Sequence, residues 1–173
     1  MSIAARPTIV TTQFDCPVGP LTAAATDAGV CLLEFAGPRV ADHTAALSQR
    51  LGAVAAPGTH RHLDSLRDEL AAYFSGTLRE FSVPLVFPGT PFQERVWGEL
   101  RRIPFGTTRS YEDVALAIGD AKAVRAVGTA NGRNRVAIVI PCHRVVNKGG
   151  GLGGYGGGLD RKRFLLDLER RHS

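Results

Sequence analysis

Apolar and β-branched residues gather in three short stretches in the first part of the chain, which is typical of short antiparallel strands. The stretches cover residues 8–14, 21–26 and 30–35, and turns rich in proline and glycine separate them. Apolar and polar residues alternate over residues 81–85, where Pro84 predicts a strand at the edge of a sheet. The N-terminal part is therefore expected to contain a small sheet.

Two segments between these stretches suit helices instead. Four apolar side chains lie on one face of a predicted helix over residues 63–74, which Gly76 ends. Residues 40–51 also suit a helix, although their apolar residues form no clean stripe. The segment 53–59 between them contains a Pro-Gly pair and is predicted to be a loop.

Helix-start signals dominate the second half of the chain. Thr90 followed by Pro91 predicts the N-terminus of a helix. Ser110 and Asp113 have the spacing of a capping box, which predicts a helix over residues 111–118. A last helix is expected to begin at about residue 160.

A second short helix, expected over residues 120–130, follows the break at Gly119. Two short helices across such a turn are typical of a helix-turn-helix. The valines of the second helix can point inward, which leaves Arg125, Gly128 and Thr129 on its outer face. Small residues around one arginine allow close approach to a nucleic acid, but a solvated surface arginine gives the same pattern.

The segment Pro141-Cys142-His143 lies between two apolar runs that are predicted to be strands, the first over residues 136–140. A thiol is a strong nucleophile only as the thiolate, and a nearby imidazole can remove its proton. Neighbouring side chains on an extended backbone point to opposite sides, so we expect a bridging water or a tight turn imposed by Pro141. A structural cysteine beside a solvated histidine is the alternative.

His143 would need an acidic partner on its far nitrogen to act as a base. Glu169 is the candidate, because it lies beside the apolar face of the last helix. Pairing of Glu169 with Arg170 or with another nearby arginine is the alternative from sequence alone.

Charge is distributed unevenly within the net charge of +5. Residues 1–88 hold six Lys/Arg and eight Asp/Glu, whereas residues 89–173 hold fifteen and eight. A basic half that carries Cys142 is expected if this half binds a polyanion such as nucleic acid. Many basic faces are only solvated, so charge alone leaves both interpretations open.

Cysteine usage and hydropathy exclude several classes of protein. Cys16, Cys31 and Cys142 form no CxxC pair, which argues against a disulfide framework or a Cys-rich zinc site. No apolar run reaches the roughly 18 residues of a membrane span, and the N-terminus lacks the build of a signal peptide. We expect a cytoplasmic protein, nucleoid-associated if bacterial, with no membrane partner and no metal.

Eight glycines lie within residues 147–158. This run opens no βαβ unit and has no Gly-Lys-Ser/Thr ending, which argues against a phosphate-binding loop. A mobile wall that folds over a substrate beside Cys142 fits the sequence better.

Together these residues resemble one family, the O6-alkylguanine-DNA alkyltransferases, also called methylated-DNA–protein-cysteine methyltransferases. The resemblance covers most of residues 60–170 in order. The matching stretches are Tyr73-Phe74-Ser75-Gly76, Gly89-Thr90-Pro91-Phe92-Gln93, Val96-Trp97, Pro104-Phe105-Gly106-Thr107, Ser110-Tyr111, Arg125-Ala126-Val127-Gly128, Asn134, Ile140-Pro141-Cys142-His143-Arg144-Val145, Gly154-Tyr155 and Gly157-Gly158-Leu159.

The resemblance implies an α+β fold in two parts. Residues 1–88 would form a small ribonuclease-H-like unit of sheet and helices. Residues 89–173 would form a mostly helical unit that carries the helix-turn-helix, binds DNA and transfers the alkyl group. A monomer that can bind cooperatively on double-stranded DNA is expected, with no cofactor.

The implied reaction transfers the alkyl group of O6-alkylguanine, and possibly of O4-alkylthymine, irreversibly to Cys142 once the damaged base has rotated out of the duplex. His143, held by Glu169 and acting through water, would deprotonate Cys142. Tyr111 would donate a proton or hydrogen bond to the leaving guanine, and Asn134 would brace the turn before Cys142.

The resemblance also implies the binding residues. Arg125 would fill the gap left by the extruded base, and the carbonyls of Cys142 and Val145 would receive its exocyclic amine. The expected DNA contacts are Arg125, Gly128, Thr129, Arg133, Arg144 and Ser110. The expected pocket residues are Val145, Tyr155, Gly156, Gly157 and Lys162.

Three positions depart from the family pattern. Gly156 lies where many relatives carry serine, so a side-chain donor to O6 is lost while the backbone N–H remains. Arg135 replaces a common proline, and Asn131 replaces a frequent apolar residue. Local DNA contacts and the range of accepted alkyl groups are therefore open.

Two other classes remain as alternatives. A cysteine hydrolase would use Cys142 and His143 repeatedly, but it does not explain a helix-turn-helix with an isolated arginine. A non-catalytic helix-turn-helix regulator would bind DNA but would not need Cys142.

Overall fold

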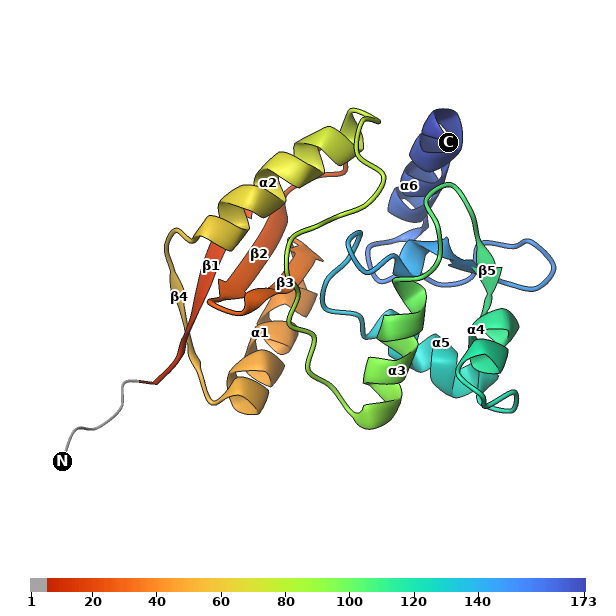
Figure 1. The fold of residues 1–173 in the computed structure, drawn as a ribbon, viewed down its shortest axis with the longest axis horizontal. Coiled ribbons are helices and arrows are strands. Elements are labelled where there is room, and N and C mark those ends of the chain that lie inside the picture. Colours follow the sequence, from red (N-terminus) through yellow and green to blue (C-terminus); the bar gives the residue numbers. More distant parts are fainter. Residues whose placement is uncertain (1–5) are drawn as a thin grey trace.

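A mixed four-stranded sheet forms the first unit of the protein, for which a computed structural model describes residues 6–173. β1 (Thr8–Phe14), β2 (Leu21–Thr26) and β3 (Gly29–Phe35) form the antiparallel meander that their strand-like composition and the turns between them predict. β4 (Val54–Pro57) pairs parallel to β1, which gives the order β3-β2-β1-β4 (Figure 1).

Two predictions for this unit are wrong. Part of the expected loop at residues 53–59 is β4, because its strand partner lies far away in the sequence and leaves no local signal. The strand expected over residues 81–85 contributes only an isolated bridge between Leu85 and Val30. The N–H of Ser82 donates to the Glu69 carboxylate instead of to a neighbouring strand.

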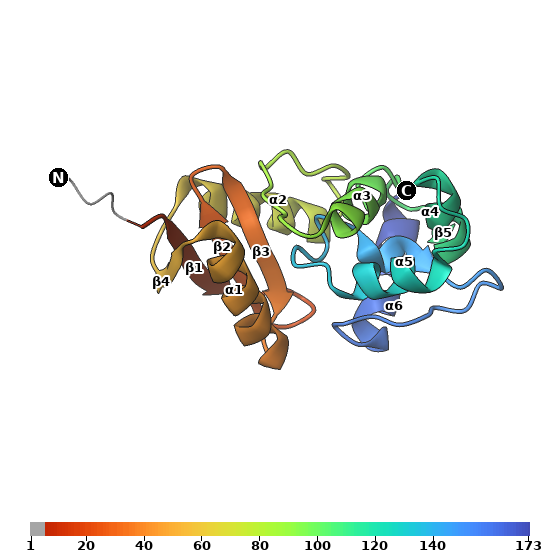
Figure 2. The same ribbon diagram turned by 90° about the horizontal axis from the view of Figure 1, so that it is seen from below.

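Helices α1 (Pro38–Leu51) and α2 (Arg61–Phe74) cover opposite faces of the sheet (Figure 2). The predicted apolar face of α2 is buried, together with Tyr73 near its C-terminus. Alternate residues of β3 enter the two cores, so that Leu33 packs on the α2 side and Leu32 on the α1 side.

The second unit contains α3 (Pro91–Leu100), α4 (Tyr111–Ala117), α5 (Val124–Gly132) and α6 (Leu159–His172). Both predicted N-termini are confirmed, because Thr90 and Ser110 each form a capping box. α4 and α5 form the expected helix pair. α5 begins at Val124, later than predicted, because the preceding residues form a turn in which the Ala123 N–H donates to the Asp120 carbonyl.

The segment before Cys142 is buried as predicted, but the strand expected over residues 136–140 is wrong. Ile138 has φ 71°, which breaks an extended backbone, and only Val136 bridges to Leu33. Cys142–Arg144 form a single 3-10 turn, η1. The two-residue strand β6 (Val145–Val146) then pairs parallel to β5 (Arg109–Ser110).

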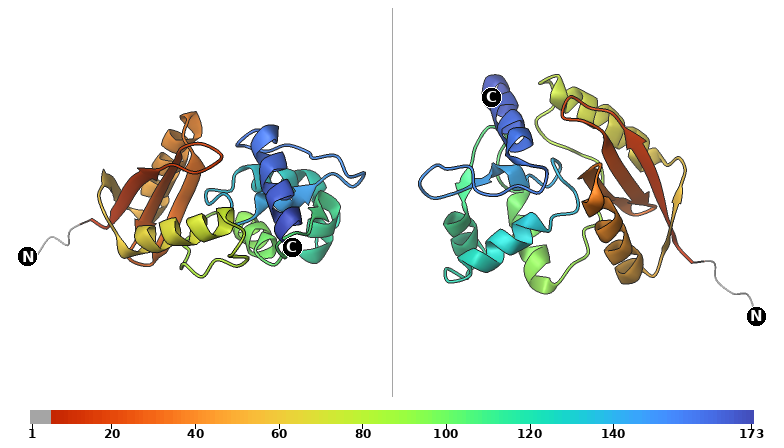
Figure 3. Two further views of the ribbon diagram at one scale, coloured as in Figure 1. Left: turned by 90° about the horizontal axis from the view of Figure 1, so that it is seen from above. Right: turned by 180° about the vertical axis from the view of Figure 1, so that it is seen from behind.

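The two units lie side by side and share one hydrophobic core (Figure 3). Backbone hydrogen bonds join them directly, since the Leu33 N–H donates to the Arg135 carbonyl and the Ala137 N–H donates to the Leu33 carbonyl, both at 2.8 Å. The last strand of the meander, β3, is thus tied to the segment that leads to Cys142.

Within residues 6–173, no helix combines the length and the apolar character needed to cross a membrane. The same residues hold no group of three His, Cys, Asp or Glu side chains arranged for a metal ion. Cys16, Cys31 and Cys142 are all free thiols.

Candidate active site

Cys142 begins the tight turn η1, and its side chain is almost completely buried. Burial raises the pKa of the Cys142 thiol to about 11, although the neighbouring Asn134 amide and the Lys162 and Arg39 cations oppose this effect. The sulfur is therefore a thiol at neutral pH, so a base must take its proton before it can act as a nucleophile.

His143 is fully buried and lies on Glu169, with 2.6 Å between Nε2 and Oε2. Burial lowers the pKa of His143, with Arg144 and Lys162 adding to this effect and Glu169 opposing it. The imidazole is thus neutral at rest. Because Glu169 can only accept when ionised, Nε2 carries the ring proton and Nδ1 keeps its lone pair.

Nδ1 of His143 accepts no hydrogen bond from another side chain or backbone group of residues 6–173. This nitrogen is therefore free to accept a proton. Cys142, His143 and Glu169 are the residue types that activated-cysteine chemistry uses as nucleophile, base and orienting carboxylate.

Glu169 also holds Arg144, which corrects one sequence-based prediction. Arg144, expected to contact DNA, is buried and donates from Nε and Nη2 to Glu169 at 2.8 and 3.1 Å. Its Nη1 donates to the Ile103 carbonyl at 2.7 Å. Three of its donors are thus used inside the protein, and a bidentate pair of this kind fixes the carboxylate.

The Asn134 side chain spans the turn before Cys142. Its Nδ2 donates to the Ile140 carbonyl at 2.8 Å, and its Oδ1 accepts from the Val136 N–H at 3.0 Å. These bonds stabilise the unusual backbone at residues 136–140.

A cavity of about 420 Å³ lies beside this turn. It is lined by Tyr111, Val124, Gly128, Asn131, Gly132, Asn147, Gly154, Tyr155 and Gly156. Nδ2 of Asn131 donates to the Cys142 carbonyl at 3.3 Å, so the wall of the cavity contacts the cysteine residue itself. Burial and the nearby Cys142 raise the pKa of Tyr111, which therefore keeps its proton at neutral pH.

Lys162 fastens the glycine-rich loop over this cavity. The ammonium is buried and donates to the carbonyls of Val145 at 2.7 Å, Gly154 at 3.1 Å and Leu152. The Val145 carbonyl, expected to receive the exocyclic amine of a base, already accepts one hydrogen bond. Gly153 has φ +70°, and a Cβ there would lie 2.8 Å from the Tyr111 hydroxyl, so glycine is required for the loop to pack on this tyrosine.

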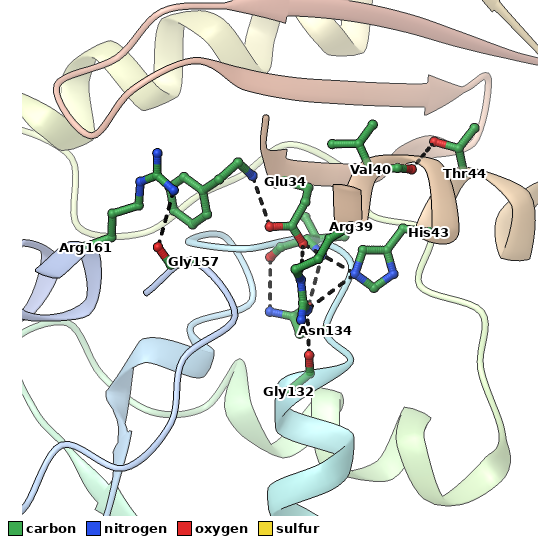
Figure 4. Close-up of polar contacts among 11 residues, drawn as sticks. Glu34, Arg39, Val40, His43, Thr44, Gly132, Asn134, Gly157 and Arg161 are labelled. Atoms are coloured by element: carbon green, nitrogen blue, oxygen red, sulfur yellow. Dashed lines mark hydrogen bonds and ion pairs between the residues drawn. The ribbon is translucent and has the colours of Figure 1, made fainter. Parts of the chain in front are cut away.

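The first unit contributes Arg39, which the sequence analysis did not identify. Figure 4 shows its guanidinium between Glu34 and His43 on one side and the Gly132 carbonyl, at 2.6 Å, on the other. A Cβ at Gly156 would lie 2.6 Å from Cζ of Arg39. The space that a side chain at Gly156 would enter is therefore filled by an arginine from α1.

Arg161 makes a second connection between the units. Its Nη1 donates to the Gly157 carbonyl (Figure 4), and its Nε donates to the Val18 carbonyl at 2.8 Å. Glycine is again required, since a Cβ at Gly157 would lie 2.5 Å from the Phe35 ring. The loop is thus held from both units.

The predicted outer face of α5 is exposed at Arg125, Thr129 and Arg133. Gly128 is half-buried and faces the ring of Tyr111. Ser110 caps α4 through its hydroxyl. Of these positions, Gly128 lines the cavity, and Arg125, Thr129 and Arg133 are accessible from outside.

Two protein-family models match the chain. The ribonuclease-like domain of 6-O-methylguanine DNA methyltransferase matches residues 9–87, and the DNA binding domain of the same family matches residues 91–171. The sequence is 49% identical over 159 residues to the methylated-DNA–protein-cysteine methyltransferase of Mycolicibacterium paratuberculosis, covering 92% of this chain and 91% of the relative. The methylated-DNA–protein-cysteine methyltransferase of Mycobacterium leprae is 45% identical, and the match covers 91% of this chain and 90% of the relative.

Solved structures agree with these sequence matches. The Mycobacterium tuberculosis OGT protein, crystallised in complex with DNA, superposes with a TM-score of 0.79 at 43% identity, covering 96% of this chain and 94% of that one. The O6-methylguanine-DNA methyltransferase of Pyrococcus kodakaraensis superposes with a TM-score of 0.62 at 27% identity, covering 93% of this chain and 98% of that one. The predicted α+β fold is confirmed, and this chain belongs to the 6-O-methylguanine DNA methyltransferase family.

Proposed function

We propose that this protein repairs DNA by moving the alkyl group of O6-alkylguanine onto the sulfur of Cys142. The observation that carries the proposal is the buried thiol of Cys142 followed in the chain by a neutral His143, whose Nε2 lies 2.6 Å from Oε2 of Glu169. Family membership supports the substrate, since the relatives are named for methylated DNA.

In the proposed reaction, Nδ1 of His143 takes the thiol proton of Cys142 through a water molecule. The thiolate attacks the alkyl carbon, so an S–C bond forms as the C–O6 bond breaks. The electron pair of the broken bond passes to guanine, which takes a proton from Tyr111. The proton held by His143 then restores the neutral phenol through solvent, and Glu169 keeps the imidazole oriented.

DNA would lie along α5, with Arg125 entering the duplex where the damaged base leaves it. The exposed Arg125 and Arg133 and the half-buried Gly128 support this placement. The extruded guanine would enter the cavity lined by Tyr111 and Tyr155. Extrusion costs a few kcal/mol, and the phosphate contacts of the basic half would offset this cost.

Each protein molecule would react once, because the product is an S-alkyl thioether. A thioether cannot be opened by thiol exchange, so ordinary cellular thiols do not restore Cys142. No cofactor takes part in this proposed scheme. The activated group is the alkylated base itself.

The number of guanines restored in the duplex per protein molecule tests this function. A duplex with one O6-methylguanine is incubated with increasing amounts of protein, digested to nucleosides and analysed for guanine and O6-methylguanine. We expect one repaired base per protein molecule and none with Cys142→Ala. Several repaired bases per protein, or hydrolysis of an ester substrate, would support a turnover enzyme instead, and tight binding of the duplex without repair would support a regulator.

A further inference from the structure

The hydroxyl of Tyr73 contacts Glu169 of the candidate active site, although Tyr73 belongs to the ribonuclease-like unit. Tyr73 is fully buried near the C-terminus of α2, and its Oη lies 2.6 Å from Oε2 of Glu169. The two residues are 96 positions apart. The mechanism above uses His143 and Glu169 but gives Tyr73 no task.

Glu169 accepts from every polar neighbour. Oε2 accepts from Tyr73, from His143 and, at 3.1 Å, from Arg144. Oε1 accepts from Nε of Arg144 at 2.8 Å and from the Gly106 N–H at 3.1 Å. Burial opposes ionisation of this carboxyl, but the hydrogen bonds and charges of His143 and Arg144 outweigh it and lower the pKa of Glu169.

His143 and Tyr73 donate hydrogen bonds to the same oxygen, Oε2 of Glu169. A carboxylate oxygen that already accepts a short hydrogen bond has less electron density to offer to a second donor. The Tyr73 hydroxyl therefore weakens the attraction of Glu169 for the proton of His143. Burial, followed by Glu169, raises the pKa of Tyr73, so the phenol keeps its proton and remains a donor.

A phenylalanine at position 73 could make the same packing contacts as the ring of Tyr73. It packs on Phe74, Phe81 and Phe105 with centroid separations of 5.3, 5.5 and 6.0 Å. Packing alone thus does not explain the hydroxyl, which would cost stability in this apolar cluster if Glu169 did not accept from it.

We propose that Tyr73 is a positioning residue of the alkyl-transfer site, which holds Oε2 of Glu169 and limits how strongly this carboxylate binds the proton of His143. The imidazole thereby stays neutral and ready to accept the thiol proton. The ionisable groups that act on the His143–Glu169 pair are Tyr73 on α2, Arg144 on η1 and Lys162 on α6. The inference rests on the proposed function and assigns the ribonuclease-like unit a part in it.

Tyr73→Phe tests this role through the pH dependence of single-turnover methyl transfer. Removal of the hydroxyl lets Glu169 stabilise the protonated imidazole, so the pKa of His143 rises and the acidic limb of the rate profile moves to higher pH. We expect a shift of about one pH unit, which lowers the rate about tenfold below the limb. The rate above the limb should change little.

Leu70→Val is the matched control, because Leu70 is buried one helical turn before Tyr73 and makes no polar contact. It should lower the melting temperature without moving the limb. An acidic limb at the same pH in Tyr73→Phe and in wild type would overturn the proposal, and so would a loss of rate by the same factor at every pH.

A second readout does not depend on alkyl transfer. In Tyr73→Phe the Nε2 proton resonance of His143, identified by its loss in His143→Gln, should move downfield because Glu169 attracts this proton more strongly. If the protein transfers no methyl group but this resonance moves, the proposed function fails while the coupling of Tyr73 to His143 stands. An unchanged resonance contradicts the coupling.

Discussion

At the scale of single residues, the buried carboxylate of Glu169 organises the active site. It accepts from Tyr73, from the Gly106 N–H and from the consecutive residues His143 and Arg144, which come from three separate parts of the chain. A buried charge of this kind is stable only when its lone pairs are satisfied. The same contacts that orient His143 therefore also contribute to folding.

Glu169→Gln should lower the free energy of unfolding at pH 7 by about 3–5 kcal/mol, because it leaves Arg144 buried without a counter-charge. The folded pKa of Glu169 is lowered, so its contribution is present above the unfolded pKa of about 4.3 and is lost as the pH falls below it. The difference in free energy of unfolding between wild type and Glu169→Gln should thus become smaller on acidification. Urea unfolding between pH 7 and pH 3.5 measures this difference.

Asp167→Asn is the control, since Asp167 lies on the same helix in a half-exposed pair with Arg170. Such pairs contribute little, so this variant should unfold like wild type throughout. A difference for Glu169→Gln that stayed constant with pH would mean that the carboxyl is not specially stabilised as an anion.

At the scale of elements, the glycine-rich loop has no regular structure of its own and depends on Lys162. One buried ammonium binds two loop carbonyls and the Val145 carbonyl of β6. The loop is therefore fastened to the strand that follows the catalytic turn.

Lys162→Met keeps the length of the side chain but removes its donors. We expect amide hydrogen exchange over residues 149–158 to become at least about tenfold faster, because each opening no longer breaks these charged hydrogen bonds. Exchange in α5 should stay as it is. Mass-spectrometric exchange at peptide resolution makes the comparison.

Lys148→Met serves as the matched control, because Lys148 adjoins the same loop but is largely exposed, paired only with Glu112. It should leave exchange in the loop unchanged. Equal acceleration in both variants would show that the buried ammonium has no special role.

Elements with local signals were predictable from the sequence. Capping residues identified the starts of α3 and α4, and periodicity identified the buried face of α2. Elements that depend on distant partners could not be predicted. β4 pairs with β1, which lies on the other side of α1 in the sequence. Residues 136–140 are apolar because they are buried, and burial alone does not distinguish a strand from another backbone conformation.

The same limit applies to the site. Cys142, His143 and Glu169 could be proposed from residue type and family resemblance. Tyr73 and Arg39 could not, since their contacts with the site exist only after the two units pack together. The family resemblance places Arg144 among the DNA contacts, whereas the fold gives it a buried partner in Glu169.

At the scale of the whole molecule, the ribonuclease-like unit takes part in building the cavity. Glu34 is buried on β3 and binds Arg39 and His43, and Arg39 reaches the end of α5 and the Gly156 backbone. This cluster is one way in which the first unit sets the position of the cavity wall.

Glu34→Gln should destabilise the protein by about 1–3 kcal/mol, because the buried acceptor loses its charge while Arg39 stays in place. Asp64→Asn, in an exposed pair with Arg67, should change stability by less than about 0.5 kcal/mol. Urea unfolding of both variants at pH 7 gives the comparison. Similar values for the two would argue that the Glu34 cluster does not join the units.

The central claim is that the sulfur of Cys142 receives the alkyl group, and intact-mass spectrometry after incubation with an O6-methylguanine duplex tests it most directly. We predict that each protein molecule gains the mass of one CH2 group, located in the peptide of residues 136–144. Unmodified duplex and the Cys142→Ala variant should give no gain. An unchanged mass while guanine is restored, or a methyl group on Cys16 or Cys31, would contradict the account.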